Sequence, residues 1–283
     1  MNIQEYFGRI SYNKPHKDAD LQTLTAIFQH HIRAIPFENL SLHCGETVEL
    51  DLQSIYNKIV RKKRGGCCLE SNPLLFWALQ ELGYDICILG GSSYEPAARA
   101  YSDEVNHILL KVVIQGNSYI VDASFGGLYQ MWEPLRLISG KDQPQVPGIF
   151  RFTEDNGTWY FEKVKRKHYI PEESETPYFT DPPALGNIRK IYRFTLEPRH
   201  INDFQDLNTY LHVCRDNIFW KKSICSLQTT EGLIGLIGWT LTETKYNYTE
   251  DTDLLHITTL TDEELEKTLK DKFNIVLENK LIP

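Results

Sequence analysis

The sequence predicts an α+β fold in which helices come first, an antiparallel β-barrel follows, and a mixed α/β segment closes the chain. Apolar residues recur with helical spacing over about the first 83 residues, and short strands separated by turn residues begin near residue 84. A helical pattern returns at the end of the chain. Runs of strands without intervening helices favour an antiparallel barrel or sandwich over repeated βαβ units. At 283 residues the chain can hold two or three packed units. We expect a helical bundle (1–83), a barrel (84–192) and an α/β lid (193–283).

The helices of the first segment are predicted by apolar side chains spaced three and four residues apart. These stripes cover residues 3–10, 21–32, 52–60 and 74–82. Asp18 or Asp20 is a candidate cap for the second helix and Asp51 for the third. Pro73 lacks an N–H and fits best in a first turn, so we expect the fourth helix to begin one or two residues after Cys68.

The strands are predicted by short β-rich runs bounded by turn residues. A hairpin is expected between residues 107–114 and 119–122 around a Gly116-Asn117 turn, and another between 150–152 and 159–164 around Asn156-Gly157. Pro, Glu, Asp and Gly dominate residues 171–187, which we interpret as a long surface insertion. Further strands are expected at 191–196, 226–228, 233–242 and 254–257, and Thr261 begins a capping box for a final helix.

Composition excludes several classes of function. A formal charge of -8 and a pI near 5.6 argue against a general nucleic-acid-binding protein. No apolar run is long enough to cross a bilayer. The N-terminus lacks the charged and apolar regions of a signal peptide, so we expect a cytoplasmic protein whose six cysteines stay reduced.

Cys68 is the best candidate for a reactive group. Arg61-Lys62-Lys63-Arg64 and two glycines precede it, and an apolar helical run follows. Cationic side chains and a helix N-terminus both favour a thiolate. His107 opens a predicted strand and Asp122 closes the next one, so the chain carries the three groups of a thiol-nucleophile site.

Spacing alone leaves alternatives open for these residues. With a Gly116-Asn117 turn, Asp122 faces Lys111, and contact with His107 needs a bulge or strong curvature. A buried cysteine is more often a small core residue, and Cys67 is a rival nucleophile. A zinc site at His43, Cys44, Cys67 and Cys68 fails on ligand spacing.

Two further groups of residues have structural as well as functional interpretations. Arg64 is expected to pair with an acid of the helical unit such as Glu38. Phe125, Tyr129 and Trp132 are either walls of a pocket or members of the core, and the sequence does not decide between the two.

Several segments resemble the arylamine N-acetyltransferases, and the likeness covers nearly the whole chain. It is carried first by residues 64–70 (Arg-Gly-Gly-Cys-Cys-Leu-Glu), Asn106-His107 and residues 121–126 (Val-Asp-Ala-Ser-Phe-Gly). Later stretches resemble the vertebrate branch: residues 36–40, 129–132, 137–147, 208–211 and 225–229.

The resemblance implies a ping-pong transfer from acetyl-CoA to arylamines, hydrazines or N-hydroxyarylamines, without a metal. Cys68 would carry the acetyl group, His107 would be its ion-pair partner and Asp122 would orient the histidine. Tyr210 would line the CoA site, and the acceptor side would be shaped by Phe37, Asn106, Phe125, Tyr129 and Phe219. The implied fold is a helical bundle, a barrel and a lid around a core like that of thiol proteases and transglutaminases. The implied protein is a monomer with small-molecule partners, which binds neither nucleic acid nor membrane.

The sequence departs from the family pattern at several positions. Cys67 replaces an aromatic residue and Glu70 a glutamine, while Asp103-Glu104 replaces a small pair near CoA. Gly127 and Ser93 replace larger residues, which suggests a different acceptor preference. The chain ends at Pro283, short of a tail that helps to close the CoA cleft in vertebrate members, so CoA affinity is expected to differ. A thiol hydrolase of related architecture and a catalytically silent binding protein are the alternatives.

Overall fold

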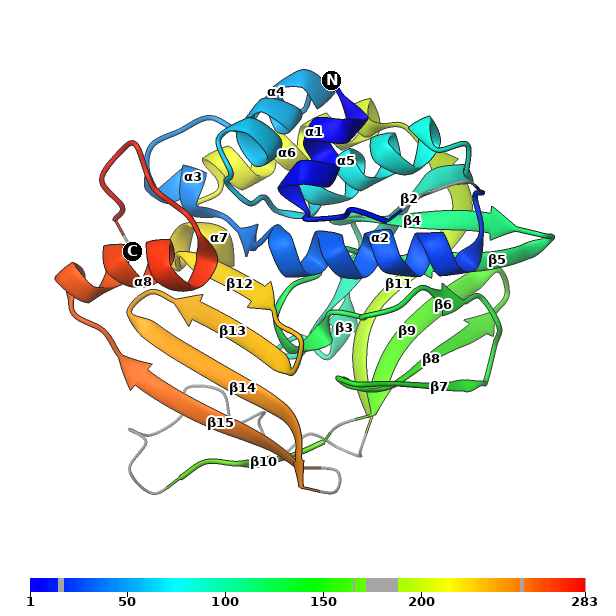
Figure 1. Ribbon diagram of the computed structural model, residues 1–283. Coiled ribbons are helices and arrows are strands. Elements are labelled where there is room, and N and C mark those ends of the chain that lie inside the picture. Colours follow the sequence, from blue (N-terminus) through cyan, green and yellow to red (C-terminus); the bar gives the residue numbers. More distant parts are fainter. Residues whose placement is uncertain (15–17, 165, 172–187, 250–251, 283) are drawn as a thin grey trace.

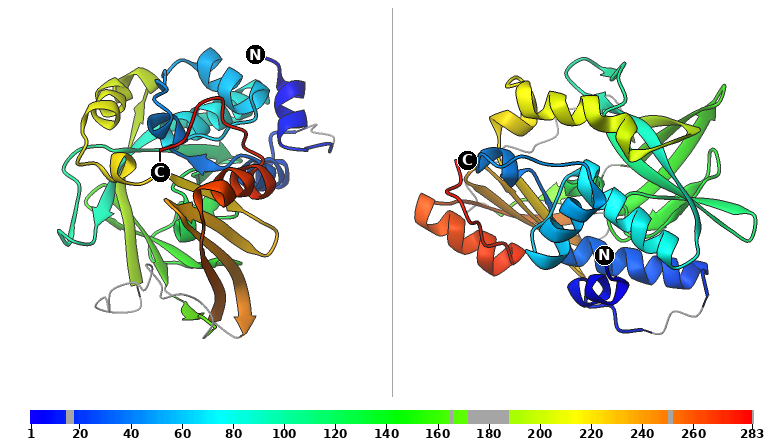
Figure 2. Two further views of the ribbon diagram at one scale, coloured as in Figure 1. Left: turned by 90° about the vertical axis from the view of Figure 1, so that its left-hand side faces the viewer. Right: turned by 90° about the horizontal axis from the view of Figure 1, so that it is seen from above.

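Helices gather on one side of the molecule and two β-sheets lie beneath them, in the computed structural model of residues 1–14, 18–164, 166–171, 188–249 and 252–282 (Figures 1 and 2). The α-helices described are α1 (Ile3–Arg9), α2 (Leu21–Ala34), α3 (Leu40–His43), α4 (Leu52–Tyr56), α5 (Cys68–Glu81), α6 (Gln205–Val213), α7 (Ile218–Lys221) and α8 (Asp262–Phe273). A π-helical turn follows α4, and two 3₁₀ turns complete the set: η1 (Asn57–Arg61), η2 (Gly127–Tyr129) and η3 (Ile201–Phe204).

Side-chain caps begin the predicted helices. The Asp20 carboxylate accepts a hydrogen bond from Thr23 N at 2.7 Å at the start of α2. Asp51 does the same for Ser54 N at 2.9 Å before α4. Thr261 forms the expected capping box at the start of α8. These contacts satisfy backbone N–H groups that a helix leaves unpaired at its N-terminus.

The prediction for the start of α5 is wrong. This helix begins at Cys68 itself, and Pro73 lies inside it. The proline removes one helical hydrogen bond, but the surrounding residues are buried: Leu69, Leu74 and Leu75 are fully covered. Burying such a side chain contributes about 1.5–3 kcal/mol, so packing against the sheet offsets the missing bond.

The larger sheet is the predicted antiparallel barrel. Its nine strands are β2 (Asp85–Glu95), β3 (Ala100–Tyr101), β4 (His107–Ile114), β5 (Asn117–Val121), β6 (Leu135–Arg136), β7 (Asp142–Gln145), β8 (Gly148–Asp155), β9 (Thr158–Val164) and β11 (Ile188–Arg199). The order is β6-β5-β4-β2-β11-β9-β8-β7, with β3 paired to β2. The Gln143 side chain on β7 exchanges hydrogen bonds of 2.8 and 2.9 Å with the Arg136 backbone on β6. A side-chain amide therefore links the two edge strands and nearly closes the barrel.

The turn between β4 and β5 differs from the prediction by one residue. Ile114 pairs with Asn117, so the turn residues are Gln115 and Gly116, with φ values of 50° and 76°. Positive φ at both central positions is the geometry of a type I′ hairpin. The register places Val121 opposite Leu110 at the end of the ladder. Asp122 therefore leaves the sheet beside the start of β4 rather than facing Lys111.

The smaller sheet belongs mainly to the C-terminal part of the chain. Its order is β1-β12-β13-β14-β15-β10, and the strands are β1 (Phe37–Glu38), β12 (Ile224–Gln228), β13 (Gly232–Ile237), β14 (Thr240–Thr249), β15 (Thr252–Thr259) and β10 (Lys167–Tyr169). The pairing is antiparallel except between β10 and β15. Phe37 of β1 pairs with Ser226 of β12. One edge of this sheet is thus supplied by the N-terminal helical segment.

The predicted organisation is confirmed as an α+β fold with a barrel. The expected boundary after residue 192 lies inside β11, and the division into three domains stays a prediction. Residues 172–187 of the expected insertion lie outside the described residues. Within the described part of the chain, no helix is both long and apolar enough to span a bilayer.

Candidate active site

Two glycines immediately before α5 allow the backbone to pass close to other atoms. A Cβ on Gly65 would lie 2.1 Å from the carbonyl oxygen of Pro36. One on Gly66 would lie 2.8 Å from Glu70 Cβ. The Gly66 N–H donates to the same Pro36 carbonyl at 3.1 Å. Only glycine fits at either position, and the result is a tight loop that places Cys67 at the helix cap and Cys68 at the first helical residue.

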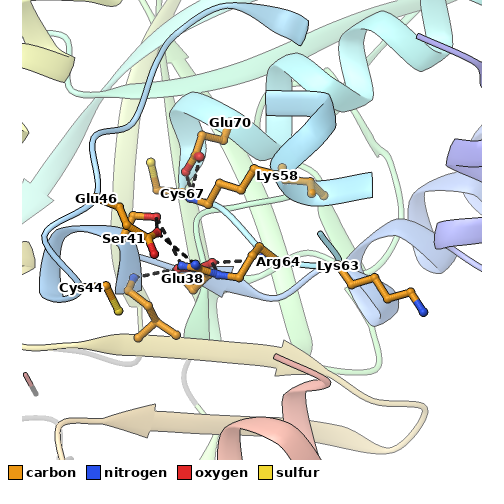
Figure 3. Close-up of polar contacts among 12 residues, drawn as sticks. Glu38, Ser41, Cys44, Glu46, Lys58, Lys63, Arg64, Cys67 and Glu70 are labelled. Carbon is orange, nitrogen blue, oxygen red and sulfur yellow. Dashed lines mark hydrogen bonds and ion pairs between the residues drawn. The ribbon is translucent and has the colours of Figure 1, made fainter. Parts of the chain in front are cut away.

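A buried cluster of charged residues holds this loop in place. Arg64 pairs with Glu38 through two contacts, Nε–Oε1 at 2.9 Å and Nη2–Oε2 at 3.2 Å, as the sequence predicted. Glu70 Oε1 accepts a hydrogen bond from Lys58 Nζ at 2.7 Å, and Glu70 Oε2 accepts one from the Cys67 N–H at 3.1 Å. Figure 3 shows the two pairs on either side of the chain that enters α5. Burial opposes the charge of Lys58, but Glu70 and Glu38 outweigh it and raise its pKa.

The basic run does not activate Cys68 in the way its sequence suggests. The Arg61 and Lys62 side chains are 54% and 59% exposed, and Arg64 is held by Glu38. Exposed charges are screened by water. The pKa of Cys68 is instead lowered by the neighbouring Cys67 thiol and by His107, which together overcome burial.

His107 and Asp122 form a buried ion pair. Their Nε2–Oδ2 distance is 2.7 Å, and their side chains are 5% and 1% exposed. Burial alone would lower the pKa of His107, but the Asp122 carboxylate and the Cys68 sulfur raise it to about 10. The pKa of Asp122 is lowered, because His107, Asn72 and the Ser124 N–H outweigh the burial of the carboxylate. The arrangement favours a Cys68 thiolate facing a protonated imidazole.

Asn72 connects the three elements that carry these residues, and the sequence analysis missed it. Its Nδ2 donates to Ile108 O at 2.6 Å and to Asp122 Oδ1 at 3.0 Å. Its Oδ1 accepts the Ala123 N–H at 2.8 Å. Residues four apart lie on the same face of a helix, so the spacing from Cys68 to Asn72 was a usable signal. This one amide holds α5, β4 and the loop after β5 together.

Aromatic rings line the other side of the imidazole. Phe125 packs edge-on against His107 with centroids 5.1 Å apart, and Tyr129 packs against Phe125 at 6.0 Å. Tyr192, on β11, lies 5.2 Å from His107 and was also missed. The Arg189 guanidinium lies over the Tyr129 ring at 4.8 Å. Phe125 and Tyr192 therefore border the imidazole, and Tyr129 packs against Phe125.

The remaining predicted residues lie at different distances from this centre. The Phe37 and Phe219 rings are in contact, with centroids 6.0 Å apart, and Phe37 also covers the Gly126 backbone. Asn106 precedes His107, and its side chain exchanges two 2.8 Å bonds with Ser93. Tyr210 is 51% exposed on α6. No described group of three or more His, Cys, Asp or Glu side chains is arranged to hold a metal ion.

Comparison with known proteins is consistent with this geometry. A family model described as N-acetyltransferase matches residues 20–282. The chain is 74% identical to the liver isozyme of arylamine N-acetyltransferase from Gallus gallus, over 100% of this chain and 98% of that protein. It is 51% identical to arylamine N-acetyltransferase 1 from Homo sapiens, over 100% and 97%. Among solved structures, the arylamine N-acetyltransferase of M. smegmatis superposes with a TM-score of 0.82 at 25% identity, covering 97% of this chain and 92% of that one.

A second structural neighbour shows the same fold. The Mycobacterium marinum arylamine N-acetyltransferase, solved in complex with CoA, has a TM-score of 0.80 at 23% identity and covers 97% of this chain and 93% of its own. The family model and the identities to the vertebrate enzymes together decide the assignment. The chain belongs to the arylamine N-acetyltransferases, a family of acyltransferases.

Proposed function

We propose that this protein transfers the acetyl group of acetyl-CoA to arylamines, hydrazines and N-hydroxyarylamines by way of a thioester on Cys68. The observation that carries the proposal is the convergence of Cys68, His107 and Asp122 from α5, β4 and the loop after β5. The solved CoA complex of the M. marinum relative supports acetyl-CoA as the donor. The cytoplasmic location, monomeric state and CoA contact of Tyr210 stay predictions.

In the first half-reaction the Cys68 thiolate attacks the thioester carbonyl of acetyl-CoA. The new C–S bond forms as the bond to CoA sulfur breaks, and the departing thiolate can take a proton from the His107 imidazolium. One thioester replaces another, so the step is close to balanced in free energy. The covalent intermediate divides one difficult encounter into two easier ones.

In the second half-reaction the neutral imidazole is a base. An amine attacks the acetyl carbonyl on Cys68, its proton passes to His107, and the Cys68 thiolate leaves. Asp122 keeps Nε2–H directed at its own oxygen, so the other ring nitrogen faces the sulfur. Asn72 would act as a positioning residue, because it holds the carboxylate and the loop that carries it.

Two adjacent cysteines provide a matched test of the nucleophile. Cys68→Ser should abolish acetylation of an arylamine, whereas Cys67→Ser should retain most of it, because Cys68 is the thiol beside His107. Initial rates at several acetyl-CoA and amine concentrations should give the parallel double-reciprocal lines of a ping-pong reaction. Full activity of Cys68→Ser would overturn the mechanism.

The orienting role of Asp122 is tested separately. Asp122→Asn should lower the rate by orders of magnitude, because the neutral amide neither stabilises the imidazolium nor fixes its tautomer. Circular dichroism shows whether the variant is folded. A near-normal rate would mean that Asp122 does not orient His107. Free CoA that accumulates without an amine and without an acetyl group on the protein would identify the hydrolase alternative, and a protein that never reacts with acetyl-CoA would be a silent binder.

A further inference from the structure

Cys67 is a second buried thiol beside the nucleophile, and the acetyl-transfer mechanism gives it no role. Both Cys67 and Cys68 are 6% exposed. The two residues are neighbours in the chain, and each thiol shifts the pKa of the other. Cys67 is fixed at the helix cap by its N–H bond to Glu70, in the charge cluster of Figure 3. The nucleophile Cys68 therefore has a second thiol next to it, and the backbone of that second residue, Cys67, is held in place by Glu70.

The two thiols differ in protonation. The contact with Cys68, followed by burial, raises the pKa of Cys67 well above its ordinary value, whereas the pKa of Cys68 is lowered. A thiolate reacts with peroxides and a thiol does not. Oxidation should therefore begin at Cys68 while Cys67 still carries its proton.

We propose that Cys67 is the resolving thiol for reversible oxidation of Cys68 and closes a vicinal disulfide with it. A hydroperoxide first oxidises the Cys68 thiolate: an S–O bond forms, the O–O bond breaks, and the alkoxide leaves to take a proton from His107. Cys67 then attacks the sulfenic sulfur. An S–S bond forms, the S–O bond breaks, and the hydroxyl departs as water with the Cys67 proton. Two thiols and one hydroperoxide become one disulfide, one alcohol and one water.

Free space lies beside the Cys67 side chain. A small cavity of about 20 Å³ borders it and is also lined by Glu38, Lys58 and Glu70. This volume is about that of one ordered water. The Cys67 side chain therefore has free space on one side, in a cavity that Cys68 does not line.

The geometry of neighbouring residues makes such a disulfide easy to reduce. Consecutive Cα atoms lie about 3.8 Å apart across a trans peptide, below the usual disulfide range of about 4.4–6.8 Å. Strained disulfides are the labile ones in thiol exchange. The pair would therefore hold the nucleophile in a state that ambient thiols reverse, short of the irreversible sulfinic acid.

The test uses hydrogen peroxide on the whole protein, without acetyl-CoA, followed by intact-mass and peptide mass spectrometry. The wild type should lose the mass of two hydrogen atoms, yield a peptide cross-linked between Cys67 and Cys68, and return to its starting mass with dithiothreitol. Cys67→Ser should instead gain one and then two oxygen atoms on Cys68, and dithiothreitol should not reverse the second. Cys87→Ser, which removes a half-buried thiol on β2, should behave like the wild type.

Two outcomes would overturn the proposal. One is sulfinic acid forming on Cys68 as fast in the wild type as in Cys67→Ser. The other is a cross-link that joins Cys68 to any cysteine except Cys67. If Cys67→Ser does not fold, Cys67→Ala serves as the second variant, and the wild-type peptide map alone still decides the cross-link. The mass readout does not use acetyl transfer, so its result is separate from that of the proposed function.

Discussion

Replacing Asn72 by alanine removes the amide that joins the three parts of the active site. The structure gives its partners as Ile108 O, Asp122 Oδ1 and Ala123 N, all buried. Asp122 Oδ1 keeps a bond from Ser124 N at 3.1 Å, so two backbone groups are left without a partner. Each unsatisfied buried group costs about 1–3 kcal/mol, which gives an expected loss of about 2–6 kcal/mol in the free energy of unfolding. A water entering the vacated space would bring the loss toward the lower end.

Urea unfolding followed by tryptophan fluorescence measures this loss. Gln53→Ala is the matched control, because Gln53 is an exposed amide on α4 with one bond to Asn57. The free energy of unfolding of Gln53→Ala should differ from that of the wild type by no more than about 0.5 kcal/mol. In folded Asn72→Ala, alkylation of Cys68 should also slow, because Asp122 is less firmly held. A loss below about 1 kcal/mol in Asn72→Ala, close to that of Gln53→Ala, would refute the role assigned to Asn72.

Three further predictions test the electrostatics and packing around the nucleophile. The rate of Cys68 alkylation by iodoacetamide should change little between pH 6 and 8, because the thiolate–imidazolium pair persists over this range. A thiol with a pKa of 8.5 would react roughly 80-fold faster at pH 8 than at pH 6, and that result would contradict the pair. Lys58→Met leaves a buried carboxylate unpaired and should cost about 3–5 kcal/mol in urea unfolding, whereas Lys62→Met, in an exposed pair, should cost less than about 1 kcal/mol. Equal losses would show that the buried pair has no special role. Gly65→Ala should lower the thermal midpoint, since overpacking costs about 1–3 kcal/mol, while Gly8→Ala, whose Cβ meets nothing within 4 Å, should stabilise α1 by about 0.5–1 kcal/mol. A neutral Gly65→Ala would contradict the tight loop.

Features that depend on nearby residues were predictable from the sequence. Asp20 and Thr261 cap helices a few residues away, and Asn156-Gly157 forms the turn between β8 and β9 with φ values of 49° and 82°. Each signal lies within one turn or one helical start. The amino-acid types there suffice to choose the local structure.

Features that depend on distant pairing were not predictable from composition or spacing. Phe37 pairs with Ser226 across most of the chain, and nothing near either residue specifies the other. The Gln143 amide that links β7 to β6 is likewise a tertiary contact. Such contacts form because the whole fold brings their partners together.

The site lies between these two cases. The three residue types at Cys68, His107 and Asp122 were visible, and the family resemblance placed them. Their contact was harder to predict. The predicted turn lay one residue too far along the chain, and it therefore placed Asp122 opposite Lys111 instead of beside the start of β4. The four-residue spacing from Cys68 placed Asn72 on the same face of the helix, but its role was missed because its partners lie on β4 and in the loop after β5.

The most direct test of the central claim is the intact mass of the protein after mixing with acetyl-CoA and no amine, with Cys68→Ser alongside. The account predicts one added acetyl group on the wild type, none on the variant, and removal of that group when an arylamine is added. An acetyl group that also appears on Cys68→Ser, or that an arylamine does not discharge, would contradict transfer through the Cys68 thioester.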